Sequence, residues 1–163
     1  MSFRKFNHLA RKSSGMSDTL RITEKPVVLV VDDDLRILQG LELNLQEKYT
    51  VRLCENSTEI MKRIDQKVRV VILDIKMPGK SGFEVYKEIK AQFPDVPIIF
   101  YSAYQNVLEG ARMSREYQPF NYFDKGGNVQ ELLESVERAV KYYDNMLNME
   151  KLVGQLRGFR EQE

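Results

Sequence analysis

The sequence predicts an α/β protein with a doubly wound, five-stranded parallel sheet and five helices. Two observations lead to this prediction. Short apolar runs rich in Val and Ile alternate strictly with segments whose apolar residues recur every three or four positions, as expected for buried strands separated by amphipathic helices. Acidic residues directly follow two of the apolar runs, at the strand ends where open α/β sheets bind their ligands.

Five apolar runs are the candidate strands. The strict alternation with helices predicts that both faces of the sheet are covered, in the flavodoxin-like strand order 2-1-3-4-5. Right-handed crossovers then place every strand-to-helix loop on one rim of the sheet. The candidate strands are Val27–Val31, Val51–Leu53, Val68–Leu73, Ile98–Tyr101 and Tyr122–Phe123.

Amphipathic segments between and after these runs are the candidate helices. Asp34 is the candidate N-cap of the first helix. Asn56 with Glu59 three residues later predicts the start of the second helix, and Asn128 with Glu131 predicts the start of the fifth. The apolar residues with helical spacing lie at Leu35–Leu45, Ile60–Ile64, Phe83–Ile89, Val107–Ala111 and Leu132–Val140.

Composition limits the class of protein. The 163 residues fit one domain, and a formal net charge of +1 gives no reason to expect direct nucleic-acid binding. The single cysteine, Cys54, excludes an internal disulfide, and the sequence lacks the Cys/His clusters of ordinary zinc sites. No apolar stretch is long enough to span a bilayer. We therefore expect a cytoplasmic protein without a membrane span.

The two ends of the chain differ from the alternating middle. Residues 1–25 are basic and lack a strand or turn pattern, so we expect a disordered extension, with an amphipathic contact to a membrane or partner as the alternative. Residues 26–143 form the expected domain. Residues 144–163 are expected to form a helical tail, which offers an apolar stripe to a partner or to a second copy, although Gly154 and Gly158 weaken the pattern. The stripe continues the helical spacing through Tyr142, Met146, Met149, Val153 and Leu156.

Acidic residues follow the first and third apolar runs. Asp32 and Asp33 come directly after Val31, and Asp74 comes directly after Leu73. If these runs are neighbouring parallel strands, the carboxylates meet at one edge of the sheet. Two carboxylates about 4 Å apart repel by roughly 4 kcal/mol at an effective dielectric near 20. Either a raised pKa or a bound cation offsets this repulsion, and the hard oxygen ligands suit Mg²⁺ or Mn²⁺.

Four motifs around this rim resemble the receiver domain of bacterial two-component response regulators. They are VLVVDDD, VVILDIKMPGKSGFE, IIFYSA and NYFDKGG, and they occur in family order and at family spacing over about residues 26–143. The resemblance implies a signalling switch and not a true enzyme. By this resemblance, Asp74 would accept a phosphoryl group from a histidine kinase or a histidine phosphotransfer protein. The domain would catalyse only its own Mg²⁺-dependent phosphorylation and dephosphorylation.

The resemblance also implies a metal site. Asp32, Asp33 and Asp74 would hold Mg²⁺ together with the backbone carbonyl of Lys76. The segment Met77–Gly79 reads as a tight turn that holds this carbonyl, with Gly79 free to adopt a positive φ. Gly82 would let the following helix approach closely.

Further residues would act on the phosphoryl group. Lys125 and Ser102 would bind its oxygens, and the small Ala103 would leave the site open. Ser102 and Tyr122 would be the switch residues, whose movement changes the face formed by the fourth helix, fifth strand and fifth helix. That face would serve a downstream protein target or a homodimer.

The sequence also departs from the family pattern. Gly126 stands where the family usually has a proline, so the loop after the fifth strand is expected to be looser. Lys76 and Tyr104 each lie two residues past a site residue and lead us to expect slow autodephosphorylation. Two alternatives stay open: a phosphorylation-independent scaffold or dimerisation module, and a phosphohydrolase, which would need a second acid where Lys76 stands.

Overall fold

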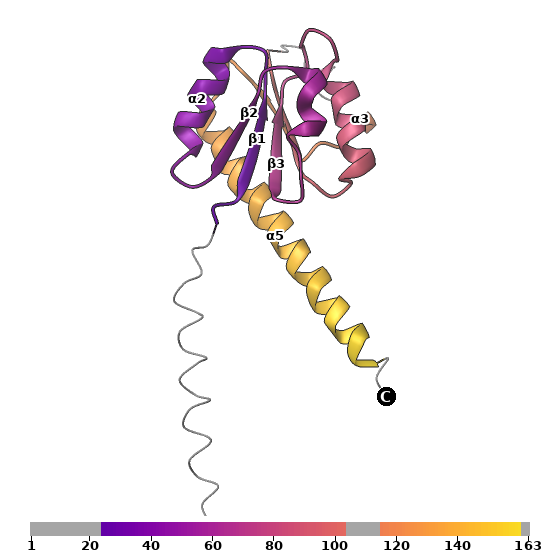
Figure 1. The fold of residues 1–163 in the computed structure, drawn as a ribbon. Coiled ribbons are helices and arrows are strands. Elements are labelled where there is room, and N and C mark those ends of the chain that lie inside the picture. Colours follow the sequence, from indigo (N-terminus) through magenta and orange to yellow (C-terminus); the bar gives the residue numbers. More distant parts are fainter. Residues whose placement is uncertain (1–23, 104–114, 161–163) are drawn as a thin grey trace, which may run out of the picture.

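The computed structural model describes residues 24–103 and 115–160, and its strands form one five-stranded parallel sheet (Figure 1). The sheet order is β2-β1-β3-β4-β5, and each neighbouring pair is parallel. The predicted fold class and strand order are therefore confirmed. The strands are β1 (Val27–Val31), β2 (Thr50–Cys54), β3 (Val68–Leu73), β4 (Ile98–Ser102) and β5 (Asn121–Asp124).

Three complete α-helices and one 3-10 helix accompany the sheet in the described residues, and residues 115 and 116 are also helical. The fourth expected helix, over Val107–Ala111, lies outside the residues that the structure describes, as do Tyr104 and residues 1–23 of the expected basic extension. No helix in the described part of the chain combines the length and the apolar character needed to cross a membrane. The helices are α2 (Leu35–Leu45), η1 (Ser57–Lys62), α3 (Gly82–Gln92) and α5 (Val129–Arg160).

The second predicted helix is present, but it is wound as a 3-10 helix. The spacing of Ile60 and Ile64 predicted a helix here, and the structure has the short η1, with the Arg63 amide donating to the Ile60 carbonyl at 2.8 Å. Its predicted N-cap is present, because the Asn56 side chain accepts from the Thr58 amide at 2.9 Å. A 3-10 helix rises faster per residue than an α-helix and is used in short connections such as this one.

Ser57, the first residue of η1, is tied to the loop that follows β3. Its hydroxyl donates to the Pro78 carbonyl at 2.9 Å and accepts from the Lys80 amide at 3.0 Å. Ser57 is buried, so these bonds are shielded from water. They connect the two loops on either side of the acidic edge of the sheet and hold the β3–α3 loop in place.

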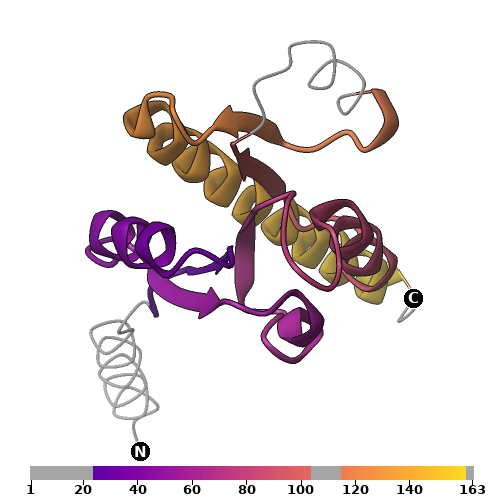
Figure 2. The ribbon, with the colours of Figure 1, turned by 90° about the horizontal axis from the view of Figure 1, so that it is seen from above.

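Alternate residues of the central strands point to opposite faces of the sheet and form two apolar layers. Figure 2 shows α2 and the first part of α5 on one side of the sheet, and η1 with α3 on the other. In β1, Val28 and Val30 pack in the layer of α2 and α5, whereas Leu29 and Val31 pack in the layer of η1 and α3. Both faces of the sheet are therefore buried, which leaves its carboxyl-end rim for function.

Gly40 offers a direct test of helix stability in α2. A Cβ built on Gly40 meets nothing within 4 Å, so an alanine fits without strain. Because alanine restricts the unfolded chain more than glycine does, we expect Gly40→Ala to raise the free energy of unfolding by about 0.5–1 kcal/mol. Urea denaturation followed by circular dichroism measures this change, and a lowered stability would contradict the assignment of α2.

Candidate functional site

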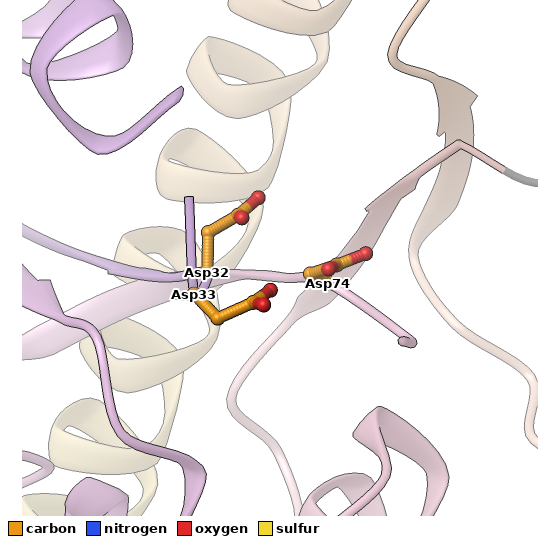
Figure 3. Close-up of side chains that lie close together, drawn as sticks. All are labelled: Asp32, Asp33 and Asp74. Carbon is orange, nitrogen blue, oxygen red and sulfur yellow. The ribbon is translucent and has the colours of Figure 1, made fainter. Parts of the chain in front are cut away.

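Three carboxylates gather at the carboxyl ends of β1 and β3. The two strands are parallel neighbours in which Val31 is paired with Leu73, so the residues that follow them emerge side by side. The Asp74 amide donates to the Val31 carbonyl at 2.9 Å. One carboxylate oxygen from each of Asp32, Asp33 and Asp74 lies within 4.8 Å of the other two (Figure 3). The structure thus brings together the three acids that the sequence placed at one edge.

Lys125, which follows β5, reaches into this acidic cluster. Its Nζ lies 2.6 Å from Oδ2 of Asp32 and 3.3 Å from Oδ2 of Asp74. The sheet register pairs Ser102 with Asp124, and the Lys125 amide donates to the Ser102 carbonyl at 3.2 Å. The side chain of Lys125 is only 15% exposed, and those of Asp32 and Asp74 are 2% and 4% exposed. The ammonium therefore neutralises charge that water cannot reach.

Burial and charge act in opposite directions on the pKa values of Asp32 and Lys125. Burial raises the pKa of Asp32, and the hydrogen bonds from Lys125 and from the Asp34 amide offset this only in part. Burial lowers the pKa of Lys125, but its hydrogen bond to Asp32 and the charges of Asp32 and Asp74 together outweigh burial, so this pKa is raised. The lysine therefore remains a cation, held by the acids that surround it.

Asp33 and Asp34 have different surroundings from Asp32. Asp33 is exposed and lines an open pocket beside Pro78 and Gly79, so its carboxylate is reached from solvent. Asp34 is the N-cap of α2, as predicted: its side chain accepts from the Arg36 amide at 2.9 Å and pairs with the Arg36 guanidinium at 2.8 Å. The hydrogen bonds from Arg36 lower the pKa of Asp34 to about 2. Asp34 thus stabilises the helix start and is not one of the three clustered acids.

The loop after β3 approaches the acidic cluster closely. Gly79 has a φ of 85°, as expected for a glycine in a tight turn. Gly82 begins α3 directly against the strand end: a Cβ built there would lie 2.2 Å from the Asp74 carbonyl oxygen and 2.7 Å from the Ile75 Cα. The predicted close approach at Gly82 is therefore present. Lys76, whose carbonyl is the expected fourth metal ligand, is exposed in this loop.

A capping box that the sequence analysis missed starts α3. The Ser81 hydroxyl accepts from the Glu84 amide, and the Glu84 carboxylate accepts from the Ser81 amide at 2.8 Å. The signal was present, because Ser81 and Glu84 form the S-x-x-E pattern of a capping box. The box fixes the start of the helix whose first residue, Gly82, touches Asp74.

The remaining predicted site residues occupy the ends of β4 and β5. Ser102 is buried, and its hydroxyl has no hydrogen-bond partner within the described ranges 24–103 and 115–160. Ala103 is exposed beside it. Tyr122 is half-buried on β5, paired in the sheet with Phe100, and packs against the apolar layer that includes α3. A buried hydroxyl without a hydrogen-bond partner is costly, and an acceptor bound beside Ser102 would remove this cost.

The loop after β5 is held by Asp124 where the sequence suggested looseness. The Gly126 amide donates to Oδ1 of Asp124 at 2.6 Å, and the Gly127 amide donates to the Asp124 carbonyl at 2.9 Å. These bonds fix the backbone next to Lys125 without a proline. Asp124, the last residue of β5, therefore also positions Lys125.

Comparison with known proteins identifies the class that this fold and site define. Residues 28–137 match the family model of the response regulator receiver domain. This match covers more than half of the chain, so the chain belongs to the response regulator receiver family. Domains of this family are phosphorylation-dependent signalling switches of two-component systems that interact with histidine kinases and downstream effectors, and they typically bind Mg²⁺ at an acidic pocket.

Individual relatives fit this assignment. The chain is 34% identical over 122 residues to the DNA-binding transcriptional regulator NtrC of Escherichia coli (strain K12), a match that covers 74% of this chain and 26% of NtrC. It is 30% identical over 120 residues to the hydrogenase transcriptional regulatory protein HoxA of Bradyrhizobium diazoefficiens, covering 71% of this chain and 24% of HoxA. The matches thus span about a quarter of the length of these curated relatives.

Solved structures show the same fold. The response regulator receiver domain protein from Clostridium thermocellum superposes with a TM-score of 0.66 at 27% identity, covering 74% of this chain and 98% of that one. The non-phosphorylated HemR receiver domain from Leptospira biflexa superposes with a TM-score of 0.64 at 27% identity, covering 71% of this chain and 94% of that one. These similarities agree with the family match.

Proposed function

We propose that Asp74 is the phosphoacceptor of this receiver domain, which we assign to residues 26–143. A carboxylate oxygen of Asp74 attacks the phosphorus of a phosphohistidine on a histidine kinase or a histidine phosphotransfer protein. The new P–O bond forms as the P–N bond breaks, and its electron pair returns to the histidine nitrogen. The observation that supports this role is that the Asp74 carboxylate lies within 4.8 Å of those of Asp32 and Asp33 and 3.3 Å from the Lys125 ammonium.

The surroundings of Asp74 suit this chemistry. Its Oδ1 accepts from the Ile75 amide at 2.8 Å, which fixes the orientation of the carboxylate, while Oδ2 faces Lys125. Lys125 offers a compact cation for a phosphoryl oxygen. The unpaired hydroxyl of Ser102 offers a further donor. In the phosphorylated state Ser102 and Tyr122 change position together, which alters the β5–α5 face that a downstream protein target recognises.

The donor set at the site fits a hard divalent cation. Asp32, Asp33 and Asp74 supply carboxylate oxygens within 4.8 Å of one another, and two of these acids are buried. They would hold Mg²⁺, or Mn²⁺ in its place, with the Lys76 carbonyl as an additional ligand. The bound cation would neutralise carboxylate charge that otherwise repels a phosphoryl group. We place the protein in the cytoplasm, since its free, buried Cys54 fits a reducing compartment.

Intact-mass measurement after incubation with acetyl phosphate and Mg²⁺ tests this function. We expect one phosphoryl adduct on the wild-type chain, no adduct on Asp74→Asn, and no adduct when EDTA removes the metal. Asp34→Asn is the matched control. The Asp34 carboxylate is near the site but caps α2, so the Asp34→Asn variant should still form the phosphoryl adduct. An adduct on Asp74→Asn would refute the assignment. Absence of any adduct, with acetyl phosphate and with a panel of histidine kinases, would favour the scaffold function instead.

A further inference from the structure

A row of exposed apolar side chains runs down α5 and past the end of the sheet. Figure 1 shows the second half of this helix projecting away from the domain. The row begins at the domain, where the Tyr142 ring lies 5.9 Å from the ring of Phe120, the residue before β5. We call these side chains the α5 stripe: Tyr142 (56% exposed), Met149 (61%), Leu152 (54%), Val153 (42%) and Leu156 (66%).

The projecting helix is fixed to the domain where it leaves the sheet. Arg69 on β3 pairs with Asp144 through an Nε–Oδ1 distance of 2.6 Å, and its guanidinium lies 5.9 Å from the centre of the Tyr143 ring. Met146 and Leu147 pack against the apolar layer next to α3. Later residues of α5, up to Arg157, are exposed. The domain therefore sets the direction of the helix but leaves the stripe uncovered by the described residues.

We propose that two copies of this chain pair in parallel through the α5 stripe and form a short coiled coil beyond the domain. Members of the stripe have heptad spacing: Tyr142, Met149 and Leu156 recur every seven residues at one core position, and Val153 occupies the other. Isolated helices of this length are marginal in water, and helix stability in proteins comes mainly from packing an apolar face. A second copy supplies the same apolar face.

The area of the stripe is sufficient for such a pair. Five large apolar side chains that are about half exposed present on the order of 500 Å² per copy, so two copies would bury at most on the order of 1,000 Å², the lower limit for a specific interface. The pairing is therefore at the weak end of stable dimers. We expect it to depend on protein concentration and on each large side chain of the stripe.

The charges beside the stripe favour the parallel arrangement. In a parallel pair, Glu150 of one copy faces Asn145 of the other, and Arg157 faces Leu152, so no like charges meet. An antiparallel pair that uses the same length of helix brings Glu150 next to Glu150 of the second copy, where like charges repel. The parallel arrangement also joins the two Tyr142 side chains at the domain ends of the helices.

Analytical ultracentrifugation over a wide range of protein concentration tests the pairing. We expect a concentration-dependent dimer, and Leu156→Glu should weaken association about tenfold or more, since it places a charge in the apolar seam. The matched control is Lys151→Glu, a change of charge at an exposed position on the opposite side of the same helix, which should leave association within a few-fold of the wild type. At concentrations where every chain is monomeric, both variants should keep the wild-type circular dichroism and unfolding temperature.

Cysteine cross-linking tests the direction of the helices. Leu156→Cys should form a disulfide-linked dimer under mild oxidation, because a parallel pair joins identical positions, while Lys151→Cys should not. The native Cys54 is buried and remains outside this reaction. A chain that stays monomeric at every concentration, or a dimer that Leu156→Glu does not weaken, would overturn the proposal. A dimer without the Leu156→Cys cross-link would overturn the parallel arrangement.

Discussion

Replacement of Lys125 by methionine is expected to lower the free energy of unfolding by about 3 kcal/mol when divalent cations are absent. The Lys125 ammonium lies 2.6 Å from Asp32 and 3.3 Å from Asp74, and both carboxylates are almost fully shielded from water. Methionine keeps the length of the side chain but removes the cation, so the two acids repel without compensation. Urea denaturation in EDTA measures the loss.

Magnesium should restore part of that stability. A cation that binds the folded state alone stabilises it in proportion to the logarithm of its concentration over its dissociation constant. The acids of Lys125→Met lack their ammonium partner, so this variant should gain more stability from added Mg²⁺ than the wild type gains. Equal gains in the two proteins would show that Lys125 and the cation do not share the same carboxylates.

Lys141→Met is the matched control for this measurement. Lys141 also forms an ion pair, with Glu137 at 2.8 Å, but its side chain is 70% exposed and the two residues are one helical turn apart. Pairs of this kind contribute roughly 0.3–0.5 kcal/mol. A loss in Lys125→Met no greater than that in Lys141→Met would contradict the compensating role of the buried lysine.

The position of the site could be predicted from the sequence, because it depends only on which residues directly follow neighbouring parallel strands. Once Val27–Val31 and Val68–Leu73 are neighbouring strands, their next residues must meet at one edge. Asp32, Asp33 and Asp74 therefore follow from two apolar runs and the acids after them. The parallel strand order also places Lys125 at this edge, because β5 ends at the same rim of the sheet. These are statements about backbone topology, which alternating apolar patterns specify well.

The pairing of side chains within the site could not be predicted in the same way. The family resemblance assigned Lys125 to the phosphoryl group, but the short distance between its Nζ and Oδ2 of Asp32 depends on the direction in which each side chain leaves the rim. The 3-10 winding of η1 likewise depends on tertiary bonds, because Ser57 is held by the Pro78 carbonyl and the Lys80 amide. Apolar spacing alone does not distinguish a short 3-10 helix from one turn of α-helix.

The second large effect is expected from Gly82→Ala, which should lower the free energy of unfolding by about 3 kcal/mol or more. The added methyl group would lie 2.2 Å from the Asp74 carbonyl oxygen and 2.7 Å from the Ile75 Cα, and both are backbone atoms that cannot rotate away. The Gly82 amide also donates to the Ile75 carbonyl at 2.8 Å, and the displaced helix would lose this bond. Either α3 or the end of β3 must move.

Gly40→Ala provides the control, because the same change in α2 meets no neighbour within 4 Å and is expected to stabilise the protein. The two variants should therefore shift the urea midpoint in opposite directions. Because Asp74 precedes the displaced backbone, Gly82→Ala should also slow the formation of the phosphoryl adduct under conditions where the variant remains folded. A Gly82→Ala protein with wild-type stability and wild-type phosphorylation would show that α3 does not hold the end of β3 in the way the structure indicates.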